Sequence, residues 1–310
     1  MNPRQVGERP GIFFHSELDS AEEWRAALST QFRHFTFCAG PVANPECVDV
    51  ALLWTVPEEG LERFTNLRAI LSLGAGIDQL EAARLPSCVP VARLLDASLT
   101  RTMVDYAKAA VYRYHRRFHL FEHQSREGRW TFLPPTMTAA TSVGILGLGE
   151  IGKEIAMALC GEGFTVRGWS RTPKHLDNVQ SYTGRSGLEA MVGCSSIVLN
   201  VLPLTDETRG ILSAQLFAQF RAGTFLINMG RGRHLIEADL LQALASGHVA
   251  DATLDVFCVE PLPPDHPFWS HRSILITPHV AGLANPHTAV TTIAANIRRA
   301  MRGEPLLHQA

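Results

Sequence analysis

A glycine-rich turn constrains the fold of this chain more than any other segment. The turn follows the apolar run Val143–Leu146 and opens a helix-like stretch, and its spacing fits G-x-G-x-x-G. In that pattern the first glycine allows a tight turn, the second lets a pyrophosphate approach the backbone, and the third lets the helix pack on the sheet. The helix N-terminus then offers free N–H groups to the phosphates. The turn predicts a dinucleotide site made of Gly147, Gly149, Glu150, Ile151 and Gly152.

Short apolar runs alternate with helix-like stretches along the chain, which predicts an α/β fold with parallel sheets. In the second half a helix is expected over about 151–162, between strands in the order of a doubly wound nucleotide-binding domain. The strands predicted there are Ser142–Leu146, Thr165–Trp169, Ser196–Val201, Thr224–Met229, Val249–Leu254 and Ile274–Thr277.

Further strands and helices are predicted in the first third of the chain and at its end. A helix is expected over Ser20–Phe32, with Ser20 as its N-cap, and one long helix over Thr102–Gln124, which contains no Pro or Gly. A last helix is expected at about 286–303, and we expect it to pack on the domain formed by the first third of the chain. The strands predicted in the first third are Gly11–His15, Val50–Val56 and Ala69–Leu73.

Composition narrows the class of protein. The 310 residues suffice for two domains, and 46% hydrophobic with 19% charged residues is a soluble globular balance. A net charge of -2 without a basic stripe argues against a nucleic-acid partner, and no apolar run is long enough to span a membrane. The N-terminus has no secretory signal, and the six cysteines lack CxxC spacing, so we expect a reduced cytoplasmic protein without a metal site.

The residues after the strand Thr165–Trp169 bear on the choice of dinucleotide. NAD enzymes hold an acidic residue about 20 residues after the glycine turn, for the ribose 2′-hydroxyl, and this chain has none there. Arginine and lysine can pair with a 2′-phosphate, and hydroxyls can donate to it. An exposed polar turn with an incidental arginine is the alternative. The segment favours NADP(H), with NAD(H) bound more weakly, through Ser170, Arg171, Thr172 and Lys174.

Three polar side chains follow successive strands of the second half. Arg231, Glu260 and His279 lie in the loops after the strands that begin at Thr224, Val249 and Ile274. Ligands of open α/β sheets bind outside the carboxyl ends of the strands, so we expect these loops to converge. Singly, the three could be a surface arginine, a solvated glutamate and a core histidine. Together they supply an anion clamp, a carboxylate partner and a proton donor.

The run from Ser142 to Gly282 resembles the D-isomer-specific 2-hydroxyacid dehydrogenases in order and spacing. The whole chain is similar to the glyoxylate/hydroxypyruvate reductase A branch of that family. The resemblance implies two doubly wound parallel-sheet domains. A Rossmann-type NAD(P)-binding domain (99–283) is inserted in a flavodoxin-like substrate-binding domain (1–98 and 284–310). The segments that carry the resemblance are Gly74–Asp78, Trp169–Thr172, Leu254–Pro264 and Ile276–Ala281.

The resemblance also implies residue roles. Arg231 grips the keto acid, His279 is the acid/base and Glu260 is its partner. Met103 would pack near the nicotinamide, and Trp130 would reach into a partner subunit, although a core or surface role for the tryptophans is equally open. Further cofactor contacts are implied for Pro203, Met229, Arg231, Asp255, His279 and Gly282, and substrate contacts for Trp54, Gly74, Ala75, Gly76, Arg231 and His279.

The activity implied by the resemblance is the NADPH-dependent reduction of small 2-keto acids, glyoxylate to glycolate and hydroxypyruvate to D-glycerate. A homodimer is expected because the family is usually dimeric. One alternative is another enzyme of the family, of D-lactate type. A second is a dinucleotide-sensing corepressor or scaffold, which the joint presence of Arg231, Glu260 and His279 disfavours.

Overall fold

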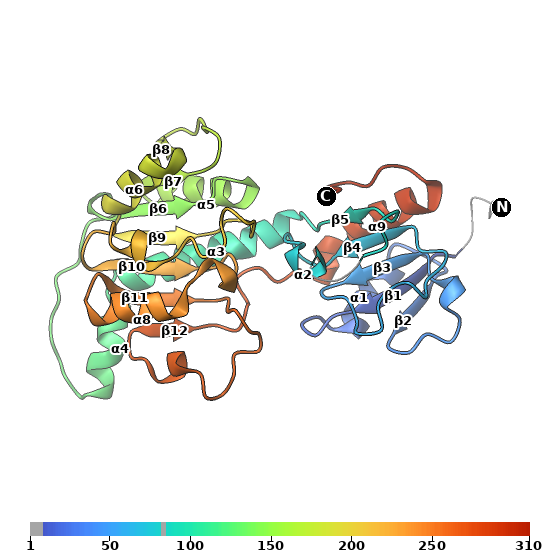
Figure 1. Cartoon of the computed structure of the whole chain (residues 1–310), viewed down its shortest axis with the longest axis horizontal. Helices are drawn as coiled ribbons and strands as arrows, with labels where there is room; N and C mark the ends of the chain where they lie inside the picture. Colours follow the sequence, from blue (N-terminus) through green and yellow to red (C-terminus); the bar gives the residue numbers. More distant parts are fainter. Residues whose placement is uncertain (1–8, 82–84) are drawn as a thin grey trace. The chain divides into compact units, whose positions relative to one another are not determined.

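The computed structural model describes residues 9–81 and 85–310, and the chain divides into two compact units, each built on one parallel sheet (Figure 1). The first unit comprises Met1–Thr100 and Gly282–Ala310, and the second comprises Arg101–Ala281. The second unit is therefore an insertion in the first. Gly282, which was expected at the end of the inserted domain, belongs to the first unit.

The five strands of the first sheet are all parallel, in the order β2-β1-β3-β4-β5. This is the flavodoxin-like order 2-1-3-4-5. The predicted fold class is confirmed for this unit. The strands are β1 (Gly11–His15), β2 (Thr36–Ala39), β3 (Val50–Leu53), β4 (Ala69–Ser72) and β5 (Val91–Ala92).

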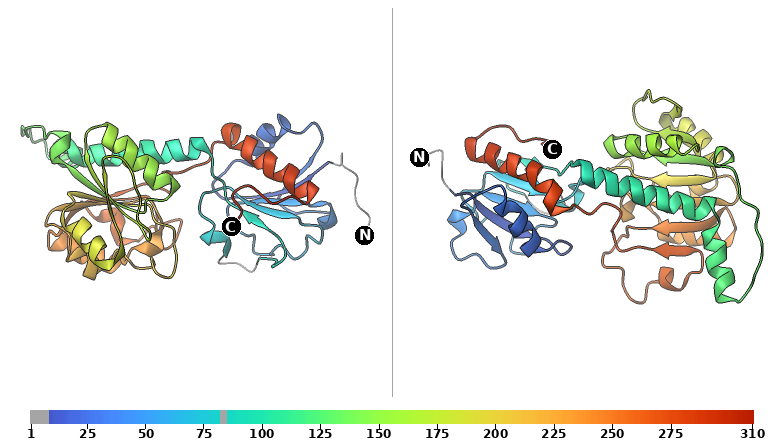
Figure 2. Two further views of the ribbon diagram at one scale, coloured as in Figure 1. Left: turned by 90° about the horizontal axis from the view of Figure 1, so that it is seen from above. Right: turned by 180° about the vertical axis from the view of Figure 1, so that it is seen from behind.

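Successive side chains of its strands point to opposite faces of the sheet, and both faces are apolar, so helices cover the sheet. Ile12 and Phe14 of β1 pack in one cluster with α1 (Ala21–Ser29) and α9 (Pro286–Arg302), which lie side by side on one face (Figure 2). Phe13 packs in the cluster of the opposite face. The last helix, α9, thus completes a core to which the first strand, β1, also contributes.

The sheet of the second unit contains seven parallel strands in the order β12-β11-β10-β9-β6-β7-β8. Counted within the unit, β6 is first, so the order contains the Rossmann series 3-2-1-4-5-6 and reverses between β6 and β9. The strands are β6 (Ser142–Leu146), β7 (Thr165–Trp169), β8 (Val179–Tyr182), β9 (Ile197–Asn200), β10 (Thr224–Asn228), β11 (Val249–Leu254) and β12 (Ile274–Ile276).

Both faces of this sheet are covered, which is why its central strands β6, β9 and β10 are mostly apolar. α3 (Ala97–His115) and α5 (Glu150–Gly161) pack on one face, and α6 (Gly184–Gly193) and α8 (Glu237–Ala245) on the other (Figure 2). The remaining helices are α2 (Asp78–Glu81), α4 (Phe118–Arg126) and α7 (Ala214–Phe217), and short 3₁₀ helices span Pro45–Cys47, Thr138–Ala140, Gly232–His234 and Pro267–Ser270.

Most predicted elements are confirmed within one to three residues, and Ser20 caps α1 by accepting a hydrogen bond from the amide of Glu23. The single helix predicted over Thr102–Gln124 is wrong. The chain forms α3 and α4 instead, and Arg117 between them adopts a left-handed conformation, φ 61°. The turn lets His119 of α4 pack, buried, against the ring of Phe225, a tertiary contact that overrides the local helical preference.

Candidate active site

The carboxyl ends of six strands in the second sheet lie in one row. The parallel register pairs Leu146 with Trp169 on one side and with Asn200 on the other, and it continues from Asn200 to Asn228. From Asn228 it runs on to Leu254 and then to Ile276. The chain therefore leaves every strand at the same edge, and the three predicted catalytic loops begin there side by side.

The glycine-rich turn starts at the centre of this edge and fits a pyrophosphate. Gly147 has φ +107°, and a Cβ on Gly152 would lie 1.8 Å from the carbonyl oxygen of Gly147. Neither position accepts a side chain. A Cβ on Gly149 would meet no atom within 4 Å, so the space beside the second glycine is open. Gly149 is the N-cap of α5, whose first amides have no partner within the helix.

The other two predicted residues of this turn lie on the first turn of α5. Glu150 is exposed, and its carboxylate is 3.0 Å from the ammonium of Lys153. Ile151 is half-buried against the core. The backbone of this turn is therefore better suited to bind phosphate than its side chains.

Four predicted cofactor residues follow β7, the neighbour of β6. Ser170 is buried, and its hydroxyl donates to the carbonyl of Thr172 at 2.8 Å, which closes the turn. Arg171 and Thr172 are exposed, and Lys174 is half-buried. Ser170 thus shapes the turn, whereas Arg171 offers the charge.

The loops that carry Arg231 and Glu260 touch through their backbones. A Cβ on Gly232 would lie 1.9 Å from the carbonyl carbon of Phe257, so only glycine fits at this crossing. Arg231 is half-buried, and its guanidinium donates to the carbonyl of Gly230 at 2.9 Å. The close contact places the two loops next to each other.

Glu260 and His279 form a hydrogen-bonded pair. Nδ1 of His279 lies 2.7 Å from Oε2 of Glu260, and the other carboxylate oxygen accepts from the amide of Phe257 at 2.8 Å. Both oxygens of Glu260 are thus engaged, one fixing the carboxylate and one fixing the imidazole. The carboxylate is bound by Nδ1 and not by Nε2, the other ring nitrogen of His279.

Asp255 anchors the loop of His279, a role that the sequence did not reveal. One carboxylate oxygen accepts from the hydroxyl of Thr277 at 2.6 Å and from the amide of Val280 at 2.9 Å, and the other accepts from the amide of Ala281 at 2.9 Å. The amide of His279 donates to the carbonyl of Asp255, and His279 has φ 54°. These bonds hold His279 in a left-handed conformation that is rare for a residue with a side chain.

Tyr106 extends this anchor to α3. Its hydroxyl lies 2.7 Å from Oγ1 of Thr277, whose own hydrogen is directed at Asp255. Burial raises the pKa of Tyr106 most, and the negative charge of Asp255 raises it further. The phenol is therefore protonated at neutral pH and can donate. A sequence motif could not have indicated this chain of bonds, because Tyr106 and Thr277 are 171 residues apart.

The remaining cofactor candidates of the second unit are placed differently. Pro203 is exposed in the loop after β9, and its carbonyl accepts from the hydroxyl of Thr208. Met229 is 97% buried in the core cluster, so only its backbone can face a ligand. Met103 is half-buried on α3, and Trp130 is fully exposed.

In the first unit, the structure brings together two of the predicted substrate elements. Trp54 follows β3, and a Cβ on Gly74 would lie 2.7 Å from its ring. The loop that contains Ala75 and Gly76 is closed by Ser72, whose hydroxyl donates to the carbonyl of Gly76 and accepts from the amide of Gly74. Trp54 and the Gly74–Gly76 loop therefore form one local surface.

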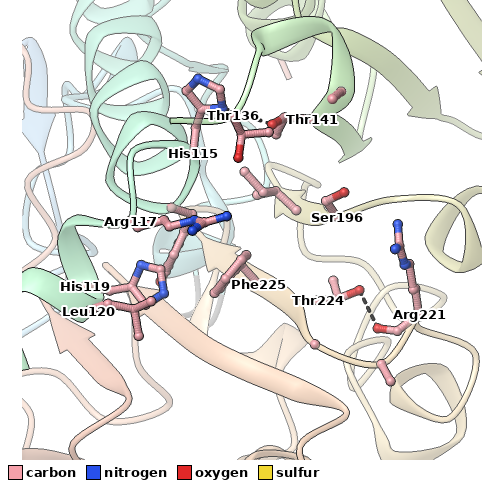
Figure 3. A pocket seen from close by; sticks show the side chains of 15 residues that line it. His115, Arg117, His119, Leu120, Thr136, Thr141, Ser196, Arg221, Thr224 and Phe225 are labelled. Carbon is pink, nitrogen blue, oxygen red and sulfur yellow. Dashed lines mark hydrogen bonds between the residues drawn. The ribbon is translucent and has the colours of Figure 1, made fainter. Parts of the chain in front are cut away.

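A cavity of about 340 Å³ lies at the opposite, amino-terminal edge of the second sheet (Figure 3). Its walls come from the junction of α3 and α4 and from residues that precede or begin strands, among them Thr141, Ser196 and Thr224. Burial lowers the pKa of His119, in its wall, to about 4, so that ring is neutral at pH 7. Ligands of open α/β sheets bind at the other edge, so we do not include this cavity in the candidate site.

Comparisons with known proteins point to one family. The family model "D-isomer specific 2-hydroxyacid dehydrogenase, NAD binding domain" matches residues 109–281. A glyoxylate/hydroxypyruvate reductase A of Serratia proteamaculans is 43% identical over 292 residues, which cover 92% of this chain and 93% of that protein. In the part of the chain that the structure describes, no helix is long and apolar enough to cross a membrane.

Two crystal structures extend the similarity to the whole fold. A D-isomer specific 2-hydroxyacid dehydrogenase of Xanthobacter autotrophicus Py2, in complex with NADPH and MES, is 41% identical with a TM-score of 0.90 and 98% coverage of both chains. An NADPH-dependent glyoxylate/hydroxypyruvate reductase of Sinorhizobium meliloti, in complex with NADP and sulfate, is 32% identical with a TM-score of 0.90, covering 97% of this chain and 98% of that one. This chain belongs to the D-isomer specific 2-hydroxyacid dehydrogenase family.

Proposed function

We propose that this protein reduces small 2-keto acids with NADPH, glyoxylate to glycolate and hydroxypyruvate to D-glycerate. The observation that carries the proposal is the hydrogen-bonded pair of His279 and Glu260 at 2.7 Å, on the strand edge that also holds Arg231 and the glycine-rich turn. The similarity to glyoxylate/hydroxypyruvate reductases supports the substrate class.

In this proposal His279 is the general acid of the reduction. When NADPH is bound, its nicotinamide supplies the hydride for the carbonyl carbon of the substrate. Negative charge then develops on the carbonyl oxygen, and Nε2 of His279 donates a proton to it. The carboxylate of Glu260 orients the ring through Nδ1 and places a negative charge beside it.

Arg231 is assigned to the carboxylate of the keto acid. A guanidinium can bind a carboxylate through two parallel hydrogen bonds, and its charge also polarises a neighbouring carbonyl. The amides of Ala75 and Gly76, in the first unit, are assigned to substrate binding, since a glycine-rich turn exposes such groups. Trp54, which packs on Gly74, is assigned to the apolar part of the substrate.

The cofactor is proposed to be NADP(H), with NAD(H) bound more weakly. The amides at the start of α5 would hold the pyrophosphate, and Arg171 would hold the 2′-phosphate. In the turn after β7, Ser170 and Thr172 stand where an NAD enzyme has a carboxylate. The complexes of the two similar proteins with NADPH and with NADP support this assignment.

Exchanging two residues of this turn should reverse the preference. In the double variant Ser170→Asp, Arg171→Gln, the new carboxylate can accept from the ribose hydroxyls and repels a 2′-phosphate. Loss of the guanidinium removes a charge-assisted bond, worth about 1.5–3 kcal/mol, or about 10- to 150-fold in NADPH affinity. Fluorescence titration with NADPH and NADH at two salt concentrations measures the change, and the wild-type preference should weaken at high salt.

Two controls accompany the titration of the double variant. The single variant Arg171→Gln separates loss of charge from introduction of the carboxylate, and the melting temperature reports whether the buried position 170 accepts aspartate. A wild-type protein that binds NADH as tightly as NADPH would contradict the cofactor assignment.

The substrate class is tested by NADPH consumption with glyoxylate, hydroxypyruvate and pyruvate in parallel. We expect reduction of the first two at higher kcat/KM than of pyruvate. Preference for pyruvate would identify a D-lactate-type enzyme. Tight NADPH binding without turnover of any 2-keto acid would indicate a dinucleotide sensor instead.

We also propose that the protein is a homodimer. Large apolar side chains are exposed on α4 and in the segment that follows it: Phe118 is 56% exposed, Phe132 81% and Trp130 100%. Phe121, Trp130 and Phe132 line one hollow, and exposed apolar side chains gathered in one place mark interaction surfaces. Sedimentation equilibrium tests the assembly, and a mass equal to one chain would exclude it.

A further inference from the structure

We propose that His234 is a positioning residue that fixes the substrate loop at Arg231 relative to the cofactor loop at Pro203. The inference rests on the functions proposed above for these two loops. His234 is fully buried and ends the 3₁₀ turn that follows Arg231.

The ring of His234 binds one loop through each nitrogen. Nδ1 accepts from the backbone amide of Arg231 at 3.1 Å and lies 2.9 Å from the side-chain nitrogen of Asn200. Both neighbours are N–H donors, so we assign Nδ1 as the acceptor and place the hydrogen on Nε2. Nε2 then donates to the carbonyl of Pro203 at 3.2 Å. This single ring joins the two loops.

Two buried asparagines tie this ring to the sheet. The amide nitrogen of Asn200 also donates to Oδ1 of Asn228 at 2.8 Å, and Asn228 in turn donates to the carbonyl of Arg231 at 3.2 Å. A Cβ on Gly230 would lie 2.8 Å from the Asn200 nitrogen and 3.1 Å from Nδ1 of His234. A side chain at position 230 would therefore displace Asn200 or His234, and glycine leaves room for their hydrogen bonds.

Two substitutions can break the two bonds separately. The terminal nitrogen of glutamine occupies nearly the position of Nε2 of histidine, whereas the oxygen of asparagine occupies nearly that of Nδ1. His234→Gln should keep the bond to Pro203 and lose the acceptor for Arg231. His234→Asn should keep the acceptor and lose the bond to Pro203.

The two variants are expected to affect different constants. Leaving the backbone amide of Arg231 and one of the two side-chain amide hydrogens of Asn200 without an acceptor costs about 1–3 kcal/mol, so His234→Gln should lower kcat/KM for glyoxylate by about 5- to 150-fold. Its Kd for NADPH should stay within about twofold. His234→Asn should raise that Kd by about three- to tenfold, because the Pro203 carbonyl still accepts from Thr208, and it should leave KM for glyoxylate at saturating NADPH unchanged.

His266 provides the matched control, because it bridges two groups in the same way outside the candidate site. Its Nδ1 accepts from the amide of Phe268 at 3.3 Å, and its Nε2 lies 3.2 Å from Glu237. His266→Gln and His266→Asn should leave both constants unchanged. Equal changes of both constants in the two His234 variants, or a lower melting temperature alone, would overturn the positioning role.

Failure of the proposed function would look different. Wild-type protein that reduces no 2-keto acid would refute that function but not the link between the loops. In that case NADPH titration, together with binding of oxamate to the NADPH complex, replaces the kinetic constants. The Gln and Asn variants should then still weaken oxamate and NADPH binding, respectively, and identical effects of the two would overturn the inference.

Discussion

Replacing His279 by alanine should lower kcat for glyoxylate reduction by about 10²- to 10⁴-fold, the usual contribution of a positioned general acid. Its ring is held by Glu260 at 2.7 Å and its backbone by Asp255 at 2.9 Å, so the wild-type imidazole is fixed in one orientation. Alanine removes the proton donor but leaves the glycine-rich turn untouched. Pre-steady-state and steady-state kinetics at pH 7, with NADPH titration alongside, measure the effect.

A fully folded variant with unchanged NADPH affinity is part of the expected result. Glu260→Gln is the companion variant. It keeps a side chain that can accept from the amide of Phe257 but loses the negative charge beside the imidazole, so it should lose less activity than His279→Ala. Near wild-type kcat in the alanine variant would remove His279 from the mechanism.

Arg231→Lys should lower kcat/KM for keto acids by about 10²-fold or more while preserving the positive charge. Lysine lacks the planar fork that binds a carboxylate through two parallel bonds, so both substrate binding and the alignment of the carbonyl suffer. The measurement is kcat and KM with glyoxylate at saturating NADPH, with oxamate inhibition as a separate measure of carboxylate binding.

Arg233→Lys is the control, because Arg233 lies in the same loop and is exposed. It should behave as wild type in all three measurements. An Arg231→Lys protein that binds NADPH poorly yet keeps its KM for the keto acid would show that the arginine serves the cofactor and not the substrate. A lower melting temperature with unchanged kinetics would indicate a purely structural side chain.

Local signals in the sequence predicted the parts of the fold and site that depend on neighbouring residues. The strand Ser142–Leu146 and the turn after it are encoded by an apolar run and by glycines at a fixed spacing in the chain. Arg231, Glu260 and His279 were predictable as neighbours because parallel strands bring their carboxyl ends to one edge.

The contacts that hold those residues in place were not predictable in this way. His234 meets Asn200 across 34 residues and Pro203 across 31, and neither distance leaves a pattern in the chain. The break between α3 and α4 was missed for the same reason. No Gly or Pro marks it, and the left-handed Arg117 accompanies the packing of His119 on Phe225, a strand residue more than 100 positions away.

The crossing of Gly232 over Phe257 has a consequence for protein design. Because the two backbones touch where a Cβ would lie 1.9 Å from a carbonyl carbon, neither loop can be transplanted to another scaffold alone. A grafted segment that carried Arg231 without the loop that contains Phe257 and Glu260 would lose the backbone against which Gly232 packs. Grafting this site into another protein therefore requires transfer of both loops together. The host sheet must have two adjacent parallel strands that end in the same register.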